Sequence, residues 1–139
     1  MTVTESQSGA VSAEPMILIV DDQSSMRLLL RQVLATDHYR IEEAKDGPQA
    51  LQRFSEVKPD MVLLDCVMPG MDGIELCRRL KELPGNESLP VLMITTLEED
   101  SLVQRAFAAG VTGYVTKPID FAVLRQRVHD LLQAGRAHR

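Results

Sequence analysis

The sequence predicts an α/β domain in which a parallel, doubly wound sheet carries helices on both faces. Short apolar runs alternate with segments whose apolar residues recur at helical spacing, and five strand-helix units follow one another along the chain. The runs are apolar throughout, as in strands that are buried on both faces. In a sheet of this kind the crossovers are right-handed and ligands bind beyond the carboxyl ends of the strands.

Five strands are expected, and most of them are located by apolar runs in the sequence. The first ends at Val20, the third at Leu64 and the fourth at Ile94, and each closes an apolar run. A second strand is expected at 39–44 and a weaker fifth one at 114–116. Because parallel strands end at one edge of the sheet, the residues that follow them should lie together.

The helices between the strands are predicted from apolar residues three or four positions apart. The first such set is Met26, Leu29, Leu30, Val33 and Leu34, and the last is Leu124, Val128, Leu131 and Leu132. A turn at Asp46, Gly47 and Pro48 opens a further helix. The last helix is expected to end near Ala134.

The length of 139 residues predicts a single domain with a core of its own. Residues 1–15 are rich in Ser, Thr, Gly and Glu and are expected to form a flexible leader outside the fold. The domain is expected at 16–134. Residues 135–139 are too few for another domain, and we expect a C-terminal tail or the start of a linker to an output domain that this chain lacks.

The composition indicates which class of partner the protein binds and in which compartment it works. A net charge of −5 gives no general reason to bind nucleic acid or an anionic membrane, so a protein partner is expected. No apolar run approaches the length of a membrane span. The two cysteines, Cys66 and Cys77, form no paired framework and are predicted to be buried thiols in a reducing cytoplasm.

Residues with complementary chemistry follow four of the predicted strands. They are Asp21, Asp22, Asp65, Thr95 and Lys117. An ionised carboxylate can attack phosphorus without a general base, but its approach to an anionic phosphoryl group needs nearby cations. Asp65 is therefore the candidate nucleophile, Asp21 and Asp22 are the candidate ligands of Mg²⁺, and Lys117 is a fixed cation. Thr95 offers a hydroxyl to a phosphoryl oxygen.

From Met16 to about Leu132, the chain resembles the receiver domain of a two-component response regulator. The matching segments are Ile19-Val20-Asp21-Asp22, Leu63-Leu64-Asp65-Cys66-Val67-Met68-Pro69-Gly70-Met71-Asp72-Gly73, Pro90-Val91-Leu92-Met93-Ile94-Thr95-Thr96 and Gly113-Tyr114-Val115-Thr116-Lys117-Pro118. The resemblance implies a flavodoxin-like sheet with five helices and the strand order 2-1-3-4-5. It implies a phosphorylation-activated switch of two-component phosphorelay signal transduction.

The resemblance also assigns roles to the site residues. Asp65 would be the phosphoacceptor for a sensor histidine kinase or a phosphotransfer protein. Asp22 would bind Mg²⁺ directly, Asp21 would assist, and Asp65 and the backbone carbonyl of Val67 would complete the metal site. A cis peptide between Lys117 and Pro118 would aim the lysine at the phosphoryl group.

The signal would leave through a change of surface. The resemblance implies that the Thr95 hydroxyl moves toward the phosphoryl group and that Tyr114 turns inward behind it. The surface of the fourth helix, fifth strand and fifth helix would change, and an output domain or a protein target would read it. The resemblance also implies that the residues two positions beyond the phosphoacceptor and beyond the hydroxyl influence attack by water. Here they are Val67 and Leu97, which cannot hydrogen-bond an incoming water, so slow self-dephosphorylation is expected.

Three alternatives stay open from the sequence. One is an enzyme, an aspartyl-phosphate phosphatase, although Asp21-Asp22-Gln23 lacks the Asp-x-Asp pattern of those enzymes. A second is an interaction module on the same fold that is not phosphorylated. A third concerns assembly: the family often forms homodimers through its last helix, yet Thr112 and Gly113 stand where many transcription-factor receivers carry pairing acids. The leading reading has no enzymatic turnover beyond self-phosphorylation and slow self-dephosphorylation.

Overall fold

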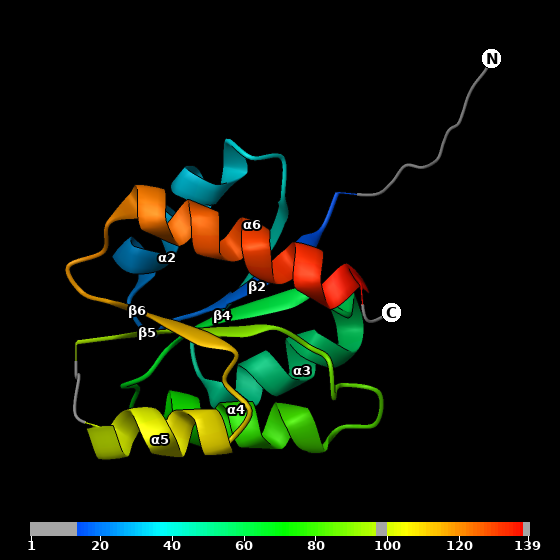
Figure 1. The fold of residues 1–139 in the computed structure, drawn as a ribbon, viewed down its shortest axis with the longest axis vertical. Coiled ribbons are helices and arrows are strands. Elements are labelled where there is room, and N and C mark those ends of the chain that lie inside the picture. The colour runs from blue at the N-terminus through cyan, green and yellow to red at the C-terminus, as the bar shows by residue number, and fades with distance from the viewer. Residues whose placement is uncertain (1–13, 97–99, 138–139) are drawn as a thin grey trace.

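Strands and helices alternate along the whole described chain (Figure 1). The computed structural model describes residues 14–96 and 100–137. The strands are β2 (Met16–Val20), β3 (Arg40–Ala44), β4 (Met61–Asp65), β5 (Val91–Thr95) and β6 (Gly113–Thr116). The helices are α2 (Ser24–Ala35), α3 (Gly47–Val57), α4 (Gly73–Glu82), α5 (Asp100–Ala108) and α6 (Phe121–Ala137).

The five strands form one parallel sheet in the order β3-β2-β4-β5-β6. Counted along the chain, this is the order 2-1-3-4-5, so the predicted fold class is confirmed. In the central pair β2 and β4, Val20 lies opposite Leu64, and the next strand places Ile94 opposite Asp65. This register brings the ends of β2, β4 and β5 to the same level at one edge of the sheet.

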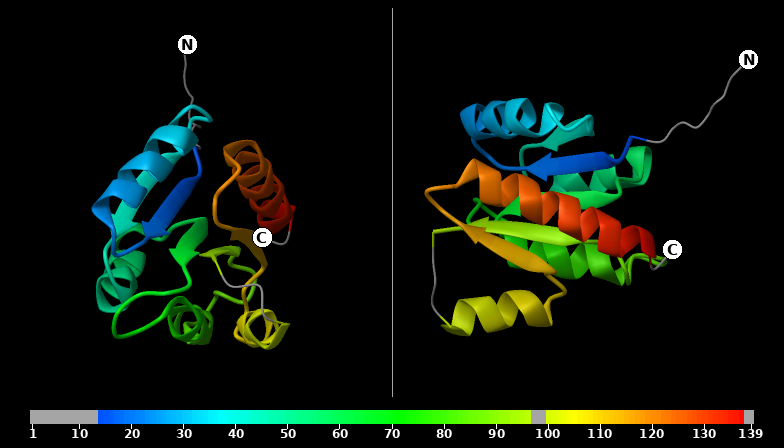
Figure 2. Two further views of the ribbon diagram at one scale, coloured as in Figure 1. Left: turned by 90° about the vertical axis from the view of Figure 1, so that its left-hand side faces the viewer. Right: turned by 45° about the horizontal axis from the view of Figure 1, so that its top comes forward.

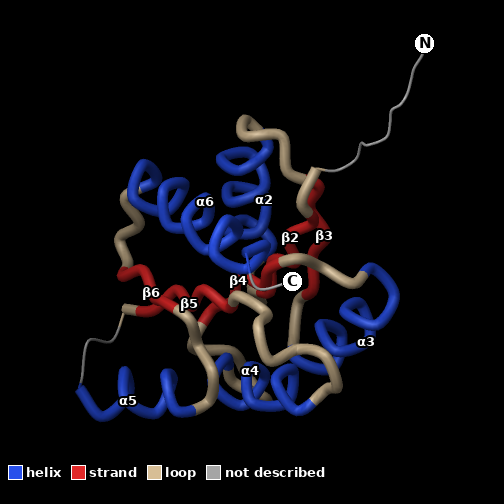
Figure 3. Tube along the Cα trace, turned by 45° about the vertical axis from the view of Figure 1, so that its right-hand side comes forward, coloured by secondary structure: helices blue, strands red, loops and turns tan. Residues whose placement is uncertain are grey.

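The continuous apolar runs are explained by two cores, one on each face of the sheet. Ile17 and Ile19 of β2 pack with α2 and α6, whereas Leu18 and Val20 of the same strand face α3, α4 and α5. Figure 3 shows the sheet between these two layers of helices. Every residue of β2, β4 and β5 is buried, so these strands have no polar face in their interior.

Three helices begin at an aspartate cap, and α2 does not. At the start of α6, Asp120 Oδ1 accepts from the N–H groups of Ala122 and Val123. The side chain of Asp46 accepts a hydrogen bond from the backbone N–H of Gln49 at the start of α3, and Asp72 does the same for α4. At the start of α2, Gln23 makes no such bond. The loop that joins β2 to α2 therefore needs other contacts to hold its shape.

The last helix is longer than predicted. The apolar spacing predicts an end near Ala134 and a tail from 135, but α6 continues through Gly135 to Ala137 (Figure 2). A Cβ atom at Gly135 would lie 2.8 Å from Cγ of Pro90, so the glycine serves a close contact with the loop before β5. It does not stop the helix. In the described part of the chain, no helix combines the length and apolarity needed to cross a bilayer.

Candidate functional site

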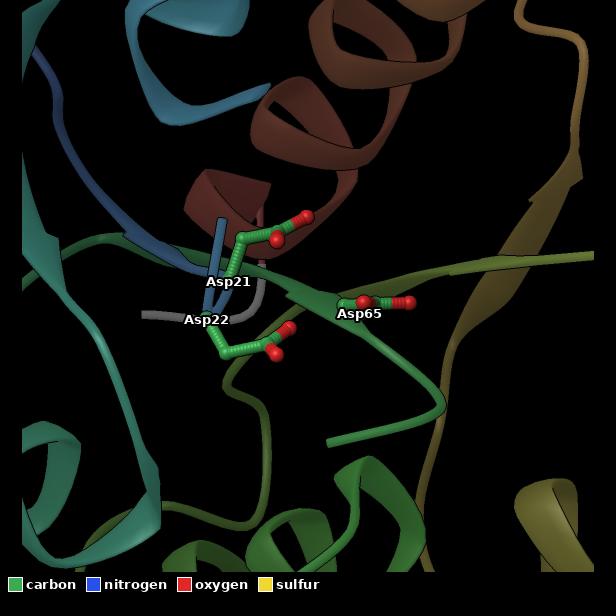
Figure 4. A group of neighbouring side chains, drawn as sticks. All are labelled: Asp21, Asp22 and Asp65. Atoms are coloured by element: carbon green, nitrogen blue, oxygen red, sulfur yellow. The ribbon is translucent and has the colours of Figure 1, made fainter. Parts of the chain in front are cut away.

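Three carboxylates meet where β2 and β4 end. Oxygen atoms of Asp21, Asp22 and Asp65 all lie within 4.8 Å of one another, and Figure 4 shows the three side chains projecting from the two strand ends. Within the described residues this is the one group of three or more acidic, histidine or cysteine side chains with such a spacing. The strand register places the acids together, because Val20 and Leu64, the residues before them, are paired across the sheet.

Asp21 is the buried member of the cluster. Its backbone N–H donates to the carbonyl of Ala44 at 3.1 Å, and its Oδ1 accepts from the N–H of Gln23 at 2.9 Å. Its Oδ2 is buried without a hydrogen-bond partner. Burial raises the pKa of the Asp21 carboxyl, and the neighbouring Asp65 raises it further, while the bond from Gln23 lowers it. An unpaired buried carboxylate oxygen beside two further acids favours a cation at this position.

Asp65 lies between the acids and one fixed cation. Its Oδ1 is 3.6 Å from Nζ of Lys117 and accepts a long hydrogen bond, 3.4 Å, from the N–H of Val67. Burial raises the pKa of Asp65, and the positive charge of Lys117 opposes that rise. The positive charge of Lys117 thus stabilises the ionised Asp65 carboxylate, whereas the negative charge of Asp22 destabilises it.

The cluster opens into a pocket of about 520 Å³. Its lining is made by Asp22, Gln23, Asp65, Val67, Met68, Pro69, Thr96 and Lys117. The Val67 side chain is 60% exposed, although it is apolar. The backbone N–H of Lys117 donates to the carbonyl of Thr95 at 2.9 Å, which holds the end of β6 beside β5.

Thr95 is placed deeper than the pocket wall. It is 1% exposed, and its side chain forms a hydrogen bond with the thiol of Cys66. Burial raises the pKa of Cys66, while that bond lowers it. The wall itself carries Thr96, a residue that the sequence reasoning passed over. Its position directly after the last residue of β5 was the available signal.

The remaining predicted site residues lie on β6 and just after it. Tyr114 is half-buried, and its ring meets that of Phe107 edge to face, with centroids 6.2 Å apart. The peptide between Lys117 and Pro118 is cis. Leu97 lies outside the described residues.

The donor set fits a hard divalent cation. Three clustered carboxylates, of which Asp22 and Asp65 line the pocket, supply the oxygen ligands that Mg²⁺ prefers, and the buried Oδ2 of Asp21 has no hydrogen-bond partner. Such a triad is typical of the Mg²⁺ site in receivers.

Sequence reasoning also missed two residues that support the cluster from outside. Arg27 donates from Nη1 to the carbonyl oxygen of Asp21 at 2.7 Å, and its Nε donates to Glu43 at 3.0 Å. The signal was a basic residue one helical turn into α2 and an acid at an interior position of β3, neither of which marks a site by itself.

Comparison with known proteins gives consistent matches. Residues 17–129 match the family model described as "Response regulator receiver domain". The chain is 35% identical over 118 residues to Chemotaxis protein CheY of Halobacterium salinarum, covering 85% of this chain and 97% of that protein. A putative response regulator from Chloroflexus aurantiacus superposes with a TM-score of 0.82 at 34% identity, covering 87% of this chain and 99% of that one.

Other relatives are longer than this chain. The Phosphate regulon transcriptional regulatory protein PhoB of Rhizobium meliloti is 37% identical over 122 residues, which cover 88% of this chain and 54% of PhoB. The chain also spans 49% of the next such relative and 25% of another. It therefore spans about half the length, or less, of the first of the curated relatives it matches.

Proposed function

The chain belongs to the response regulator receiver domain family, and from that membership we propose that it is a phosphorylation-activated switch of two-component signalling. Asp65 accepts a phosphoryl group from a sensor histidine kinase or a phosphotransfer protein. The family, with relatives such as Sporulation initiation phosphotransferase F of Bacillus subtilis, supports partners of this kind. The proposed setting is the cytoplasm.

The observation that carries this proposal is the placement of Asp65. It is the acid of the cluster that lies within 3.6 Å of the Lys117 ammonium, and it lines the open pocket. A nucleophile for an anionic donor must be reachable and must be balanced by positive charge. Asp65 meets both conditions, whereas Asp21 is 1% exposed and is not among the residues that line the pocket.

The proposed transfer needs no general base. An oxygen of the Asp65 carboxylate forms a bond to phosphorus while the phosphorus–nitrogen bond of the donor phosphohistidine breaks. The electron pair of that bond returns to the imidazole, which takes up a proton. Lys117 stabilises negative charge on the phosphoryl oxygens, and Thr95 supplies a hydroxyl once it reaches the pocket.

Mg²⁺ is the proposed cofactor, and Asp21, Asp22, Asp65 and the backbone carbonyl of Val67 are the proposed ligands. When bound, the ion neutralises charge between the carboxylates and the incoming phosphoryl group. Backbone groups orient the carboxylates: the Val67 N–H donates to Asp65 Oδ1, and the Gln23 N–H donates to Asp21 Oδ1.

The proposed output is a change of surface around α5, β6 and α6. Thr95 and Tyr114 lie on neighbouring strands, with Tyr114 opposite Met93 in the register of β5 and β6. Withdrawal of the Thr95 hydroxyl toward the phosphoryl group would leave space for the Tyr114 ring behind it. A linked output domain or a separate protein target binds this surface, and this domain itself does not bind nucleic acid. Homodimer formation is a second proposed consequence of the change.

The test is acceptance of a phosphoryl group from a small donor. The protein is incubated with acetyl phosphate, with and without Mg²⁺, and its intact mass is measured beside that of Asp65→Asn. We expect a base-labile gain of one phosphoryl group that requires both Mg²⁺ and Asp65. A matched control, Asp130→Asn, removes a carboxylate from the exposed face of α6 and should be modified like wild type.

Two outcomes would replace the proposal. No gain of mass from folded protein that binds Mg²⁺ would leave an interaction module that works without phosphorylation. Multiple turnover of a chromogenic phosphate ester would show a phosphatase instead of a switch.

A further inference from the structure

The backbone that carries the two acids of β2 is held from helix α2 by one arginine. Arg27 Nη1 donates to the carbonyl oxygen of Asp21 at 2.7 Å, and Nε of the same guanidinium donates to Glu43 Oε1 at 3.0 Å. The Arg27 side chain is 17% exposed, so these contacts are largely sheltered from water. Arg27 thereby connects the Asp21 backbone to β3, the neighbouring strand of the sheet.

The carbonyl group that accepts the hydrogen bond from Arg27 lies between the two acids of the cluster that follow β2. It belongs to the peptide group that joins Asp21 to Asp22, and a peptide group is planar. A bond that holds this oxygen therefore restrains the plane between the two residues, and with it the ψ angle of Asp21 and the φ angle of Asp22, on which the directions of their side chains depend. The opposite end of Asp21 is fixed by its N–H, which donates to the carbonyl of Ala44.

The loop needs this support because the helix after it has no side-chain cap. Gln23, at the N-cap position of α2, makes no cap hydrogen bond, whereas α3 and α4 each start at a capping aspartate. Arg27 reaches back across the first turn of α2 to the end of β2. Glu43 holds the guanidinium in the orientation that this reach requires, and it also binds Arg31.

We propose that Arg27, oriented by Glu43, is a positioning residue for the acid cluster and sets the affinity of that cluster for Mg²⁺. The proposal rests on the proposed function and deepens it, because it names a residue that acts on the metal site through the backbone. Groups that orient metal ligands without touching the metal change metal affinity by roughly 10–100-fold when they are removed. We expect the lower end of that range, since Asp21 keeps its bonds to Gln23 and Ala44.

The direction of the effect separates this role from a simple charge effect. A guanidinium near a divalent cation repels it, so an arginine that acted through its charge alone would weaken Mg²⁺ binding, and its loss would tighten binding. A positioning residue has the opposite effect, and its loss weakens binding.

The chain offers a matched control in Arg31. Its Nε donates to Glu43 Oε2 at 2.7 Å and its Nη2 donates to the carbonyl of Ile41 at 3.3 Å. It thus shares the same acid partner as Arg27 and lies on the same helix, but those bonds do not involve Asp21. Loss of either arginine removes one ion pair with Glu43, and only loss of Arg27 frees the Asp21 carbonyl.

The experiment measures the Mg²⁺ dissociation constant of the whole chain without any phosphodonor, by following backbone amide NMR shifts during a titration with MgCl₂. We expect Arg27→Met to raise that constant about tenfold. Arg31→Met should stay within about twofold of wild type, and Arg27→Lys, which keeps a donor for the Asp21 carbonyl, should fall between them. Thermal unfolding without Mg²⁺ should show similar losses for both methionine variants.

Three results would overturn the proposal: unchanged or tighter binding by Arg27→Met, equal weakening by Arg27→Met and Arg31→Met, or no Mg²⁺ binding by wild type. The last result alone would also overturn the proposed metal site, so the two failures are distinguishable. Should Arg27→Met not fold, Arg27→Lys against Arg31→Lys decides, and equal dissociation constants would reject the role of Arg27.

Discussion

At the scale of single residues, the pocket combines the proposed nucleophile, Asp65, with apolar neighbours. Asp65 and Lys117 face each other across 3.6 Å, while the exposed Val67 side chain lines the same pocket. Val67 has no group in its side chain that could hold an attacking water. A phosphoryl group on Asp65 would therefore be shielded on this side from hydrolysis.

Replacement of Val67 tests that shielding. Val67→Asn, which places an amide at the pocket wall, should shorten the lifetime of the phosphorylated form several times over. Combination with Leu97→Glu should shorten it further. The decay is followed by intact mass after removal of donor, with Val67→Ala as the control that adds no hydrogen-bonding group. Equal lifetimes for Val67→Asn and Val67→Ala would contradict the idea.

The buried thiol of Cys77 gives a stability prediction that depends on pH. Burial raises its pKa from 9.0 to about 11. A folded-state pKa above the unfolded value means that the thiol favours folding below pH 9 and that this contribution is lost as pH rises toward 11. The loss should reach about 2 kcal/mol. Denaturant unfolding of wild type and Cys77→Ala across this range measures it, and parallel pH profiles would refute it.

At the scale of elements, the site depends on how closely α4 approaches the end of β4. The backbone N–H of Gly73 donates to the carbonyl of Cys66 at 2.9 Å. A Cβ atom at Gly73 would lie 2.4 Å from the backbone oxygen of Asp65, closer than real contacts allow. The glycine is therefore required by the proximity of the helix to Asp65, the proposed phosphoacceptor.

Gly73→Ala should disturb both stability and the site. Overpacking of this kind costs roughly 1–3 kcal/mol, and the shift it forces falls on the backbone of Asp65. Gly113→Ala is the matched control, because a Cβ there would meet side-chain carbons at 3.6 Å and 3.8 Å, which are ordinary contacts. Chemical unfolding should therefore separate the two variants clearly. Similar losses for both would mean that the close approach is not what Gly73 serves.

The elements show what sequence reasoning can reach. Apolar runs were sufficient to locate β2, β4 and β5 in the sequence. These central strands are buried on both faces, so polar residues do not interrupt their apolar runs. The last helix was expected to end near Ala134, whereas α6 continues to Ala137 and Gly135 packs against Pro90, a contact that the sequence pattern does not reveal. The role of Arg27 was also out of reach, because its partners Asp21 and Glu43 come together only through the sheet.

At the scale of the whole molecule, the fold concentrates unfavourable charge at one edge and is stabilised elsewhere. Two apolar cores flank the sheet, and burial raises the pKa values of Asp21 and Asp65 in between. Three close carboxylates repel one another and are partly removed from water. The cluster therefore lowers the stability of the folded domain when no cation is bound, and the same three carboxylates can bind a cation.

Thermal stability should therefore respond to charge at the cluster. Without Mg²⁺, Asp65→Asn should be more stable than wild type by on the order of 1 kcal/mol, because it removes a buried charge that Asp22 also repels. Mg²⁺ at a hundredfold excess over its dissociation constant should stabilise wild type by about 2.7 kcal/mol and the variant by less. Calorimetry with and without the ion measures both effects. Asp130→Asn should show the Mg²⁺ response of wild type, and an equal response in Asp65→Asn would contradict the assignment.

The most direct measurement of the central claim is the identity of the residue that carries the phosphoryl group. Protein treated with acetyl phosphate and Mg²⁺ is reduced with borohydride, which converts an aspartyl phosphate to homoserine, and its peptides are sequenced by mass spectrometry. We predict homoserine at position 65 and at no other aspartate, and none in samples without Mg²⁺. Homoserine at Asp21 or Asp22, or none at all from folded protein that has bound Mg²⁺, would contradict the account.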